Sequence, residues 1–142
     1  MIFMIKNILI FILSNFLFKS AYSDHLKFEF IWGDIPSCTD GKSFEVKSPK
    51  FIFSSLPKDA KWVYLKIRNI GLSDFDHGGG WVELKGKSTI ESGKFNYFSS
   101  CPKSGKEIFQ WTAYFTTKKS SLLFYGQPLG VIHKVSSKKK YP

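Results

Sequence analysis

Ionisable side chains and glycines are concentrated in residues 74–81, which read DFDHGGGW. Glycine leaves the backbone free to present N–H groups to an anion, and Gly79 lies at the centre of the triplet. His77 could donate a hydrogen bond or titrate near neutral pH. Asp74, Asp76 and His77 could instead hold a cation, although their spacing matches no established metal motif, and no metal is predicted. A flexible hairpin loop with solvated charges is the third interpretation.

A second candidate loop covers residues 99–111 (SSCPKSGKEIFQW) and leads into an aromatic segment. Together with Trp81, Phe109 could line the wall of a pocket. No GxSxG, HExxH or glycine-rich phosphate loop occurs, and Ser48 and Ser104 have no evident base beside them. We therefore predict a protein that is not an enzyme and that has no cofactor.

The first 23 residues have the composition of a signal peptide. An apolar run from Ile8 to Phe18 is too short to span a bilayer, and Ala21 and Ser23 form a small-x-small cleavage site. Lys19 is unusual for a signal peptide, so an uncleaved membrane anchor is the alternative interpretation of this segment. We predict one exported domain over residues 24–142, periplasmic or secreted, with no transmembrane span in the mature chain.

Composition limits the partners. The net charge is +10, yet Arg68 is the only arginine, whereas specific nucleic-acid recognition favours the forked guanidinium group. We predict no nucleic-acid partner, and the positive charge would allow weak attraction to anionic surfaces. Cys38 and Cys101, the two cysteines, are expected to form a disulfide in an oxidising compartment, which would stabilise the fold by about 4 kcal/mol. Two separate thiols are the alternative.

Short runs of alternating apolar residues, separated by turn residues, predict an all-β sandwich of about seven to nine short strands with little helix. Residues 108–117 form the longest run and predict a central strand. Residues 119–126 could form a helical turn, and residues 137–142 (SKKKYP) are expected to be a solvated end. His25 and His133 are expected to be structural or solvated. The remaining expected strands are 26–32, 43–46, 50–53, 62–67, 81–84 and 131–135.

Residues 38–117 resemble the phosphatidylethanolamine-binding protein family, particularly its bacterial Raf-kinase-inhibitor-like branch. The resemblance rests on a Cys-x-Asp-Gly turn at 38–41, Ser48-Pro49 leading to Phe53, the Leu-Pro turn at 56–57, the loop CPKSG at 101–105 and the aromatic strand at 109–114. It implies the β-sandwich of that family and a pocket for a phosphate-like group.

The ligand motifs of the family are replaced in this chain. Its Asp-Pro-Asp motif falls on Asn69-Ile70-Gly71, its strand histidine falls near Val82 or Glu83, and its His-Arg pair falls on Glu107-Ile108. Glu107 would repel a phosphate-like group by about 4 kcal/mol at a separation of about 4 Å. The resemblance therefore implies a retained frame from which the phosphate site has been lost.

The expected function is recognition of a small ligand or a protein partner, of unknown identity, through a cleft between residues 69–81 and 101–107. An inhibitor that docks an exposed loop into a partner enzyme is the alternative. A hydrolase would need a nucleophile within hydrogen-bond reach of His77. The expected ligand-binding residues are Asn69, Asp74, Asp76, His77, Gly79, Trp81, Glu107 and Phe109.

Overall fold

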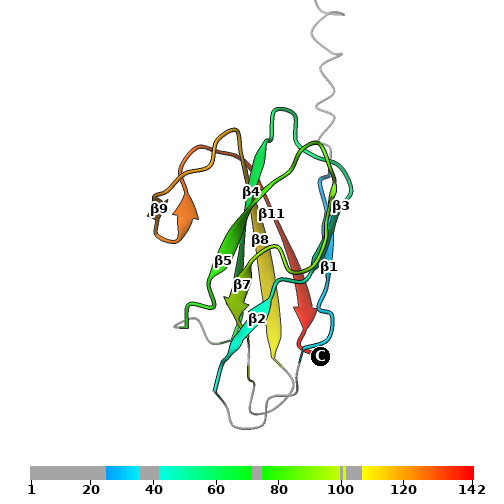
Figure 1. Ribbon diagram of the computed structural model, residues 1–142, viewed down its shortest axis with the longest axis vertical. Helices are drawn as coiled ribbons and strands as arrows, with labels where there is room; N and C mark the ends of the chain where they lie inside the picture. Colours follow the sequence, from blue (N-terminus) through cyan, green and yellow to red (C-terminus); the bar gives the residue numbers. More distant parts are fainter. Residues whose placement is uncertain (1–24, 36–41, 72–74, 100, 102–106) are drawn as a thin grey trace, which may run out of the picture.

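The computed structural model describes residues 25–35, 42–71, 75–99, 101 and 107–142 (Figure 1). The expected signal peptide and Cys38 lie outside these residues. No helix among the described residues is long and apolar enough to cross a membrane. The described residues contain strands and no helix, which confirms the predicted all-β class. The strands are β1 (Phe28–Ile31), β2 (Glu45–Lys47), β3 (Lys50–Phe53), β4 (Trp62–Asn69), β5 (Gly79–Glu83), β6 (Thr89–Ile90), β7 (Asn96–Phe98), β8 (Ile108–Thr116), β9 (Leu123–Phe124), β10 (Gln127–Pro128) and β11 (Val131–Lys140).

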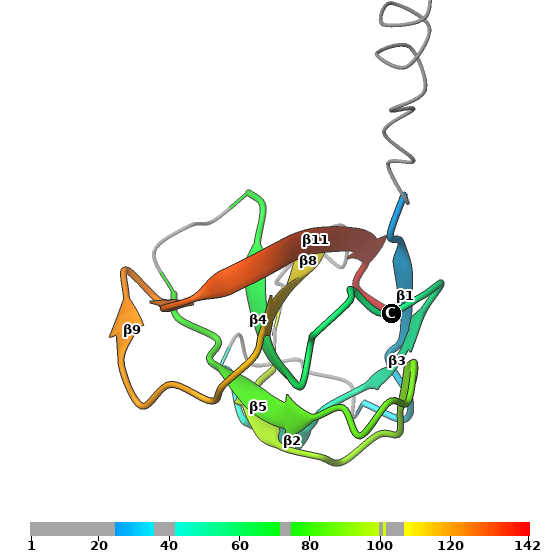
Figure 2. The same cartoon turned by 90° about the horizontal axis from the view of Figure 1, so that it is seen from above.

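Two antiparallel sheets enclose the core (Figure 2). One has the order β1-β3-β6 and the other the order β11-β8-β4-β5, while β2-β7 and β9-β10 form separate two-stranded sheets. If β1, β3, β4, β5, β6, β8 and β11 are named A, B, C, C′, E, F and G, the neighbours are A-B-E and G-F-C-C′, the Greek-key order of immunoglobulin-like sandwiches. The chain thus passes between the sheets from β3 to β4 and returns from β5 to β6.

The core follows from alternation of side chains along the strands. Every second residue of β1 and β3 points inward, and so do Leu65 of β4 and its neighbours two positions away. Aromatic rings join the two sheets: the Phe51 and Trp111 rings are 5.1 Å apart and those of Phe53 and Phe115 are 5.2 Å apart, both pairs edge to face. The predicted central strand is confirmed, because β8 lies between β11 and β4.

The predicted helical turn at 119–126 is wrong. This segment forms the β9-β10 hairpin, in which Tyr125 and Gly126 at the turn have φ angles of 50° and 71°. Two consecutive left-handed residues build the tight turn that suits the twist of a hairpin, and glycine accepts this conformation without strain. The two-residue strands β6, β9 and β10 also explain why eleven strands replace the seven to nine expected.

The predicted solvated end at 137–142 is wrong as well. Residues 131–140 form β11, which pairs with β8 over almost its whole length. Lys139 donates from Nζ to the carbonyl oxygen of Phe30, and Trp32 donates from Nε1 to the carbonyl oxygen of Lys140 at 3.1 Å. These bonds tie β11 to β1, and Tyr141 is buried beside them. Backbone pairing with the central strand outweighs the solvation of this lysine-rich segment.

Candidate functional site

The four-stranded sheet carries a polar cavity of about 260 Å³ on its outer face, between the strands and the β9-β10 hairpin. The β9-β10 hairpin stands apart from the two main sheets (Figures 1 and 2). Its residues 125–127 line one side of the cavity. The lining residues are Lys66, Arg68, Gln110, Thr112, Tyr114, Tyr125, Gly126, Gln127, Lys134 and Ser136.

Strand register brings these side chains together. Because Leu65 and Ile67 of β4 point into the core, Lys66 and Arg68 point to the outer face. The polar residues of β8 and β11 lie on the same face at the same level. Rows across the sheet are Tyr64-Tyr114-Lys134, Lys66-Thr112-Ser136 and Arg68-Gln110-Lys138.

The floor of the cavity is a connected set of hydrogen bonds. The Oγ1 atom of Thr112 and the Oγ atom of Ser136 are 2.9 Å apart. Gln110 donates from Nε2 to Thr112 at 3.1 Å and to Ser136 at 3.3 Å. Its Oε1 atom is 3.5 Å from Nη2 of Arg68, which donates to it. Gln110 thereby connects the guanidinium group to the floor through a long hydrogen bond, and its own buried amide is hydrogen-bonded.

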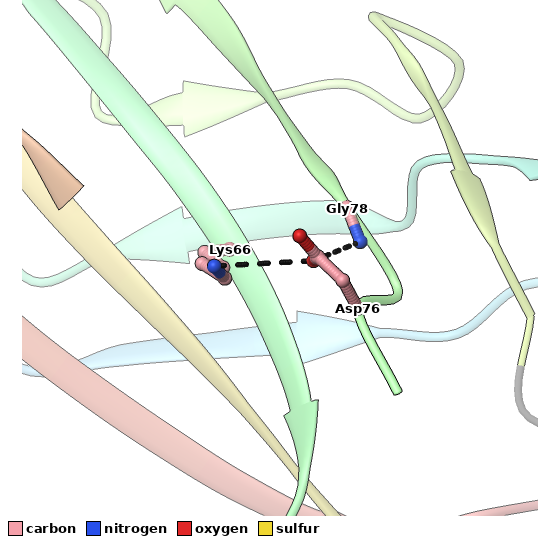
Figure 3. Close-up of polar contacts among 3 residues, drawn as sticks. All are labelled: Lys66, Asp76 and Gly78. Carbon is pink, nitrogen blue, oxygen red and sulfur yellow. Dashed lines mark hydrogen bonds and ion pairs between the residues drawn. The ribbon is translucent and has the colours of Figure 1, made fainter. Parts of the chain in front are cut away.

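Positive charge dominates this cavity. Lys66 is 3.9 Å from Oδ1 of Asp76, which also accepts a 2.9 Å hydrogen bond from N of Gly78 (Figure 3). This ion pair is weak because Asp76 is largely in solvent. Within the part of the chain that the structure describes, Arg68 and Lys134 have no carboxylate within salt-bridge distance. An anion that entered would therefore meet cations that are not already neutralised.

Two tyrosines next to the cations remain neutral donors. Burial raises the pKa of Tyr114, and nearby Arg68 opposes this only in part. Burial, followed by the charge of Asp76, raises the pKa of Tyr64. Lys134 lies over the Tyr114 ring at 6.0 Å from its centre. The tyrosines thus add no negative charge to the site at neutral pH.

The residues expected to form the cleft are largely occupied with one another. Asn69 donates from Nδ2 to Oε2 of Glu107 at 2.8 Å. His77 is only 6% exposed, its Nδ1 atom is 3.0 Å from the carbonyl oxygen of Phe98, and its ring contacts Phe109 edge to face at 5.6 Å. Burial is the main cause of the lowered pKa of His77. These side chains therefore pack against one another at one end of the sandwich.

Two other expected site residues, Gly79 and Trp81, make packing contacts with β4. A Cβ at Gly79 would overlap the carbonyl oxygen of Leu65, so that this glycine permits close approach of β5 to β4. Trp81 packs against Tyr64 at 5.3 Å and lines a second hollow together with Lys85, Lys94 and neighbouring residues of β5 and β6.

The remaining expected site residues lie in the core, at the edge of the cavity or outside the residues that the structure describes. Phe109 is fully buried, whereas Asp76 reaches the edge of the cationic cavity through Lys66. Asp74 lies outside the described residues. Cys101 is not a free thiol, but its expected partner Cys38 also lies outside them, so their pairing stays a prediction.

The sequence interpretation missed the cavity, although a signal was present. Gln110 and Thr112 are polar residues within a strand that is otherwise aromatic and apolar, and Lys66 and Arg68 alternate with core residues. Polar positions with period two on a central antiparallel strand indicate an outer face that is in contact with solvent, on which these side chains could be expected, but they do not predict that the face is hollowed. The described residues contain no group of three or more His, Cys, Asp or Glu side chains that could hold a metal ion.

Comparisons of the chain with protein-family models, with curated proteins and with solved structures give no match.

Proposed function

We propose that this protein is an exported, non-enzymatic binding protein that recognises an anionic group of a small ligand in the cavity beneath the β9-β10 hairpin. The observation that carries the proposal is the convergence of Lys66, Arg68 and Lys134 over a hydrogen-bonded polar floor, with Asp76 as a weak counter-charge to Lys66. Export rests on the composition of residues 1–23.

The size and donor set of the cavity support one anionic group with a small body attached. A volume of about 260 Å³ is slightly below the usual range for sites that hold drug-sized ligands. The planar guanidinium of Arg68 suits two oxygens of a carboxylate, phosphate or sulfate, while Lys66 and Lys134 act as point charges. Hydroxyl and amide groups on the floor could then bind the neutral part of the ligand.

Recognition is favoured over turnover by the chemistry of the lining. The ionisable side chains of the lining are Lys66, Arg68, Lys134 and two tyrosines, and burial raises the pKa of Tyr114. The lining contains neither a histidine nor a carboxylate, the side chains that most often act as a general base. His77, the side chain that a hydrolase would need, is buried at the end of the sandwich and is not part of this lining.

The alternative function, an inhibitor with an exposed loop, would use the β9-β10 hairpin. Its side chains at 122–125 are exposed and apolar, as an inserted loop would require. An inserted loop would, however, leave the cations and the hydrogen-bonded polar floor behind the hairpin without a role, whereas ligand binding uses them.

Titration calorimetry with inorganic phosphate, phosphoethanolamine, galacturonic acid and neutral galactose tests the proposal. We expect saturable binding of at least one anion, weakened at least about tenfold in Arg68→Gln and Lys134→Gln. Lys138→Gln is the matched control, because Lys138 lies on the same face of β11 outside the cavity lining. Binding that is equally weak in Lys138→Gln would indicate general charge attraction, and the absence of anion binding to the wild-type chain would contradict the proposed function.

A further inference from the structure

The β9-β10 hairpin and its flanks carry a concentration of exposed apolar side chains. Leu122, Phe124 and Tyr125 are 67%, 66% and 88% exposed. Of the thirteen exposed large apolar residues in the described chain, seven fall within residues 122–132. An apolar surface gathered in one projecting segment indicates an interaction site, whereas scattered exposed residues do not.

Both faces of this hairpin are apolar at its tip. Successive side chains of a strand point to opposite faces, and Leu122, Leu123, Phe124 and Tyr125 are consecutive and all exposed. A hairpin that packed one face on a partner protein would keep a polar second face. A tip that is apolar on both sides suits surroundings that envelop it, as the interfacial region of a lipid bilayer does.

The lysines around the hairpin favour a membrane surface that contains anionic lipids. Residues 108–142 contain six lysines and neither aspartate nor glutamate. Lys118 and Lys119 precede the hairpin, and Lys134 follows it; the Nζ atom of Lys119 lies 5.6 Å from the ring centre of Trp62. Lysines beside an apolar segment attract an anionic membrane surface within a Debye length, each contributing about 1 kcal/mol.

We propose that the tip of this hairpin, residues 122–125, inserts into the surface of a bilayer that contains anionic lipids, with Lys118, Lys119 and Lys134 at the level of the head groups. The aromatic residues Phe124 and Tyr125, whose rings contact each other at 4.5 Å, provide the amphipathic groups that interfaces favour. This inference rests on exposure and charge around the hairpin; it shares Tyr125 and Lys134 with the cavity lining but does not require a ligand in the cavity.

Vesicle sedimentation of residues 24–142, the chain without the expected signal peptide, tests the inference. One set of vesicles contains phosphatidylcholine alone, and the other contains equal parts of phosphatidylcholine and phosphatidylglycerol. The test variant is Leu122→Ser/Phe124→Ser, since neither residue lines the cavity. The control is Ile31→Ser/Ile52→Ser, which removes two exposed apolar side chains from the opposite sheet. Thermal unfolding confirms that each variant is folded.

We expect binding to the anionic vesicles, at least about tenfold weaker binding by the hairpin variant, and unchanged binding by the control. Equal binding by wild type and hairpin variant, or equal loss in both variants, would overturn the inference. Self-association that is abolished by the hairpin substitutions, without vesicle binding, would identify a second copy as the partner and would also overturn it. Anion binding in the cavity, measured without lipid on the same variant, reports on the proposed function separately.

Discussion

The side chain of Asn69 joins the end of β4 to the residue that precedes β8 through its 2.8 Å hydrogen bond to the carboxylate of Glu107. Its Oδ1 atom accepts a second hydrogen bond from N of Gly71 at 2.9 Å, and N of Ile70 donates to the carbonyl oxygen of Ile108 at 3.0 Å. Asn69 is buried. The partner of the Glu107 carboxylate is thus a neutral amide, which does not cancel its charge. The contact is favourable only because the amide of Asn69 donates a hydrogen bond.

Asn69→Asp should destabilise the protein in a pH-dependent way. The substitution replaces the donor by a second carboxylate of the same shape and places two negative charges in contact. We expect a loss of about 2 kcal/mol in the free energy of unfolding at neutral pH. Because the repulsion raises the pKa of the pair in the folded state, the loss should diminish as the pH falls and one carboxyl group becomes protonated. Urea unfolding of the variant at several pH values measures this.

The double variant Asn69→Asp/Glu107→Gln is the control for that prediction. It restores one donor and one acceptor in exchanged positions, and its stability should return to within about 0.5 kcal/mol of the wild type. A double variant as unstable as Asn69→Asp alone would show that the hydrogen bond is not what the first substitution disrupts.

His77 should make the protein less stable in mild acid. Burial lowers its pKa below the ordinary value of 6.5, although backbone groups of Phe98 and Ser99 and the charges of Asp76 and Glu107 oppose the shift. The unfolded chain therefore binds more protons below pH 6.5 than the folded chain. Stability from neutral His77 is fully present above that pH and is lost as the pH falls toward the folded-state pKa, by at most about 1.4 kcal/mol per pH unit.

Denaturant unfolding between about pH 5 and about pH 8 measures this slope. His77→Asn should flatten it, because the amide can still donate to Phe98 and does not titrate in this range. His133→Asn is the matched control, since His133 is exposed on β11, and it should keep the wild-type slope. A slope that persists in His77→Asn would assign the pH dependence to other groups.

The strands were predictable where alternation and burial coincide. In residues 50–53 and 62–67, every second side chain is large and apolar, and these are the residues that meet across the two sheets. The β9-β10 hairpin was not predictable in the same way. Its four consecutive apolar residues have no alternation, since none of them faces the core.

The cavity could not be predicted from local pattern alone. Lys66 and Lys134 are far apart in sequence, and they come onto one face only because β8 lies between β4 and β11. That order is set by long-range pairing. Conversely, Asp76, His77 and Glu107 were singled out for their chemical type, but each has a different partner in the fold. Exposed Asp76 pairs with Lys66, buried His77 contacts the carbonyl oxygen of Phe98, and Glu107 accepts a hydrogen bond from Asn69.

Tyr141 tests whether the C-terminal segment belongs to the fold. Its ring packs against Trp32 at 5.7 Å and Phe109 at 5.6 Å, and its backbone N donates to the carbonyl oxygen of Glu107 at 3.0 Å. Tyr141→Ala should cost about 3 kcal/mol in the free energy of unfolding, because it removes a buried ring from the edge of the core. Lys140→Ala, at an exposed position of β11, is the control and should cost less than about 0.5 kcal/mol.

Unlike Tyr141→Ala, Tyr141→Phe should not lower the free energy of unfolding. Burial raises the pKa of Tyr141, and among the described residues its buried hydroxyl group has no hydrogen-bond partner. Removal of an unsatisfied polar group while the ring is kept should leave stability unchanged or raise it by up to about 1 kcal/mol. Guanidinium unfolding followed by tryptophan fluorescence compares the three variants. If Tyr141→Ala were no more costly than Lys140→Ala, the end of the chain would not be part of the core, and the pairing of β11 with β8 would have to end before it.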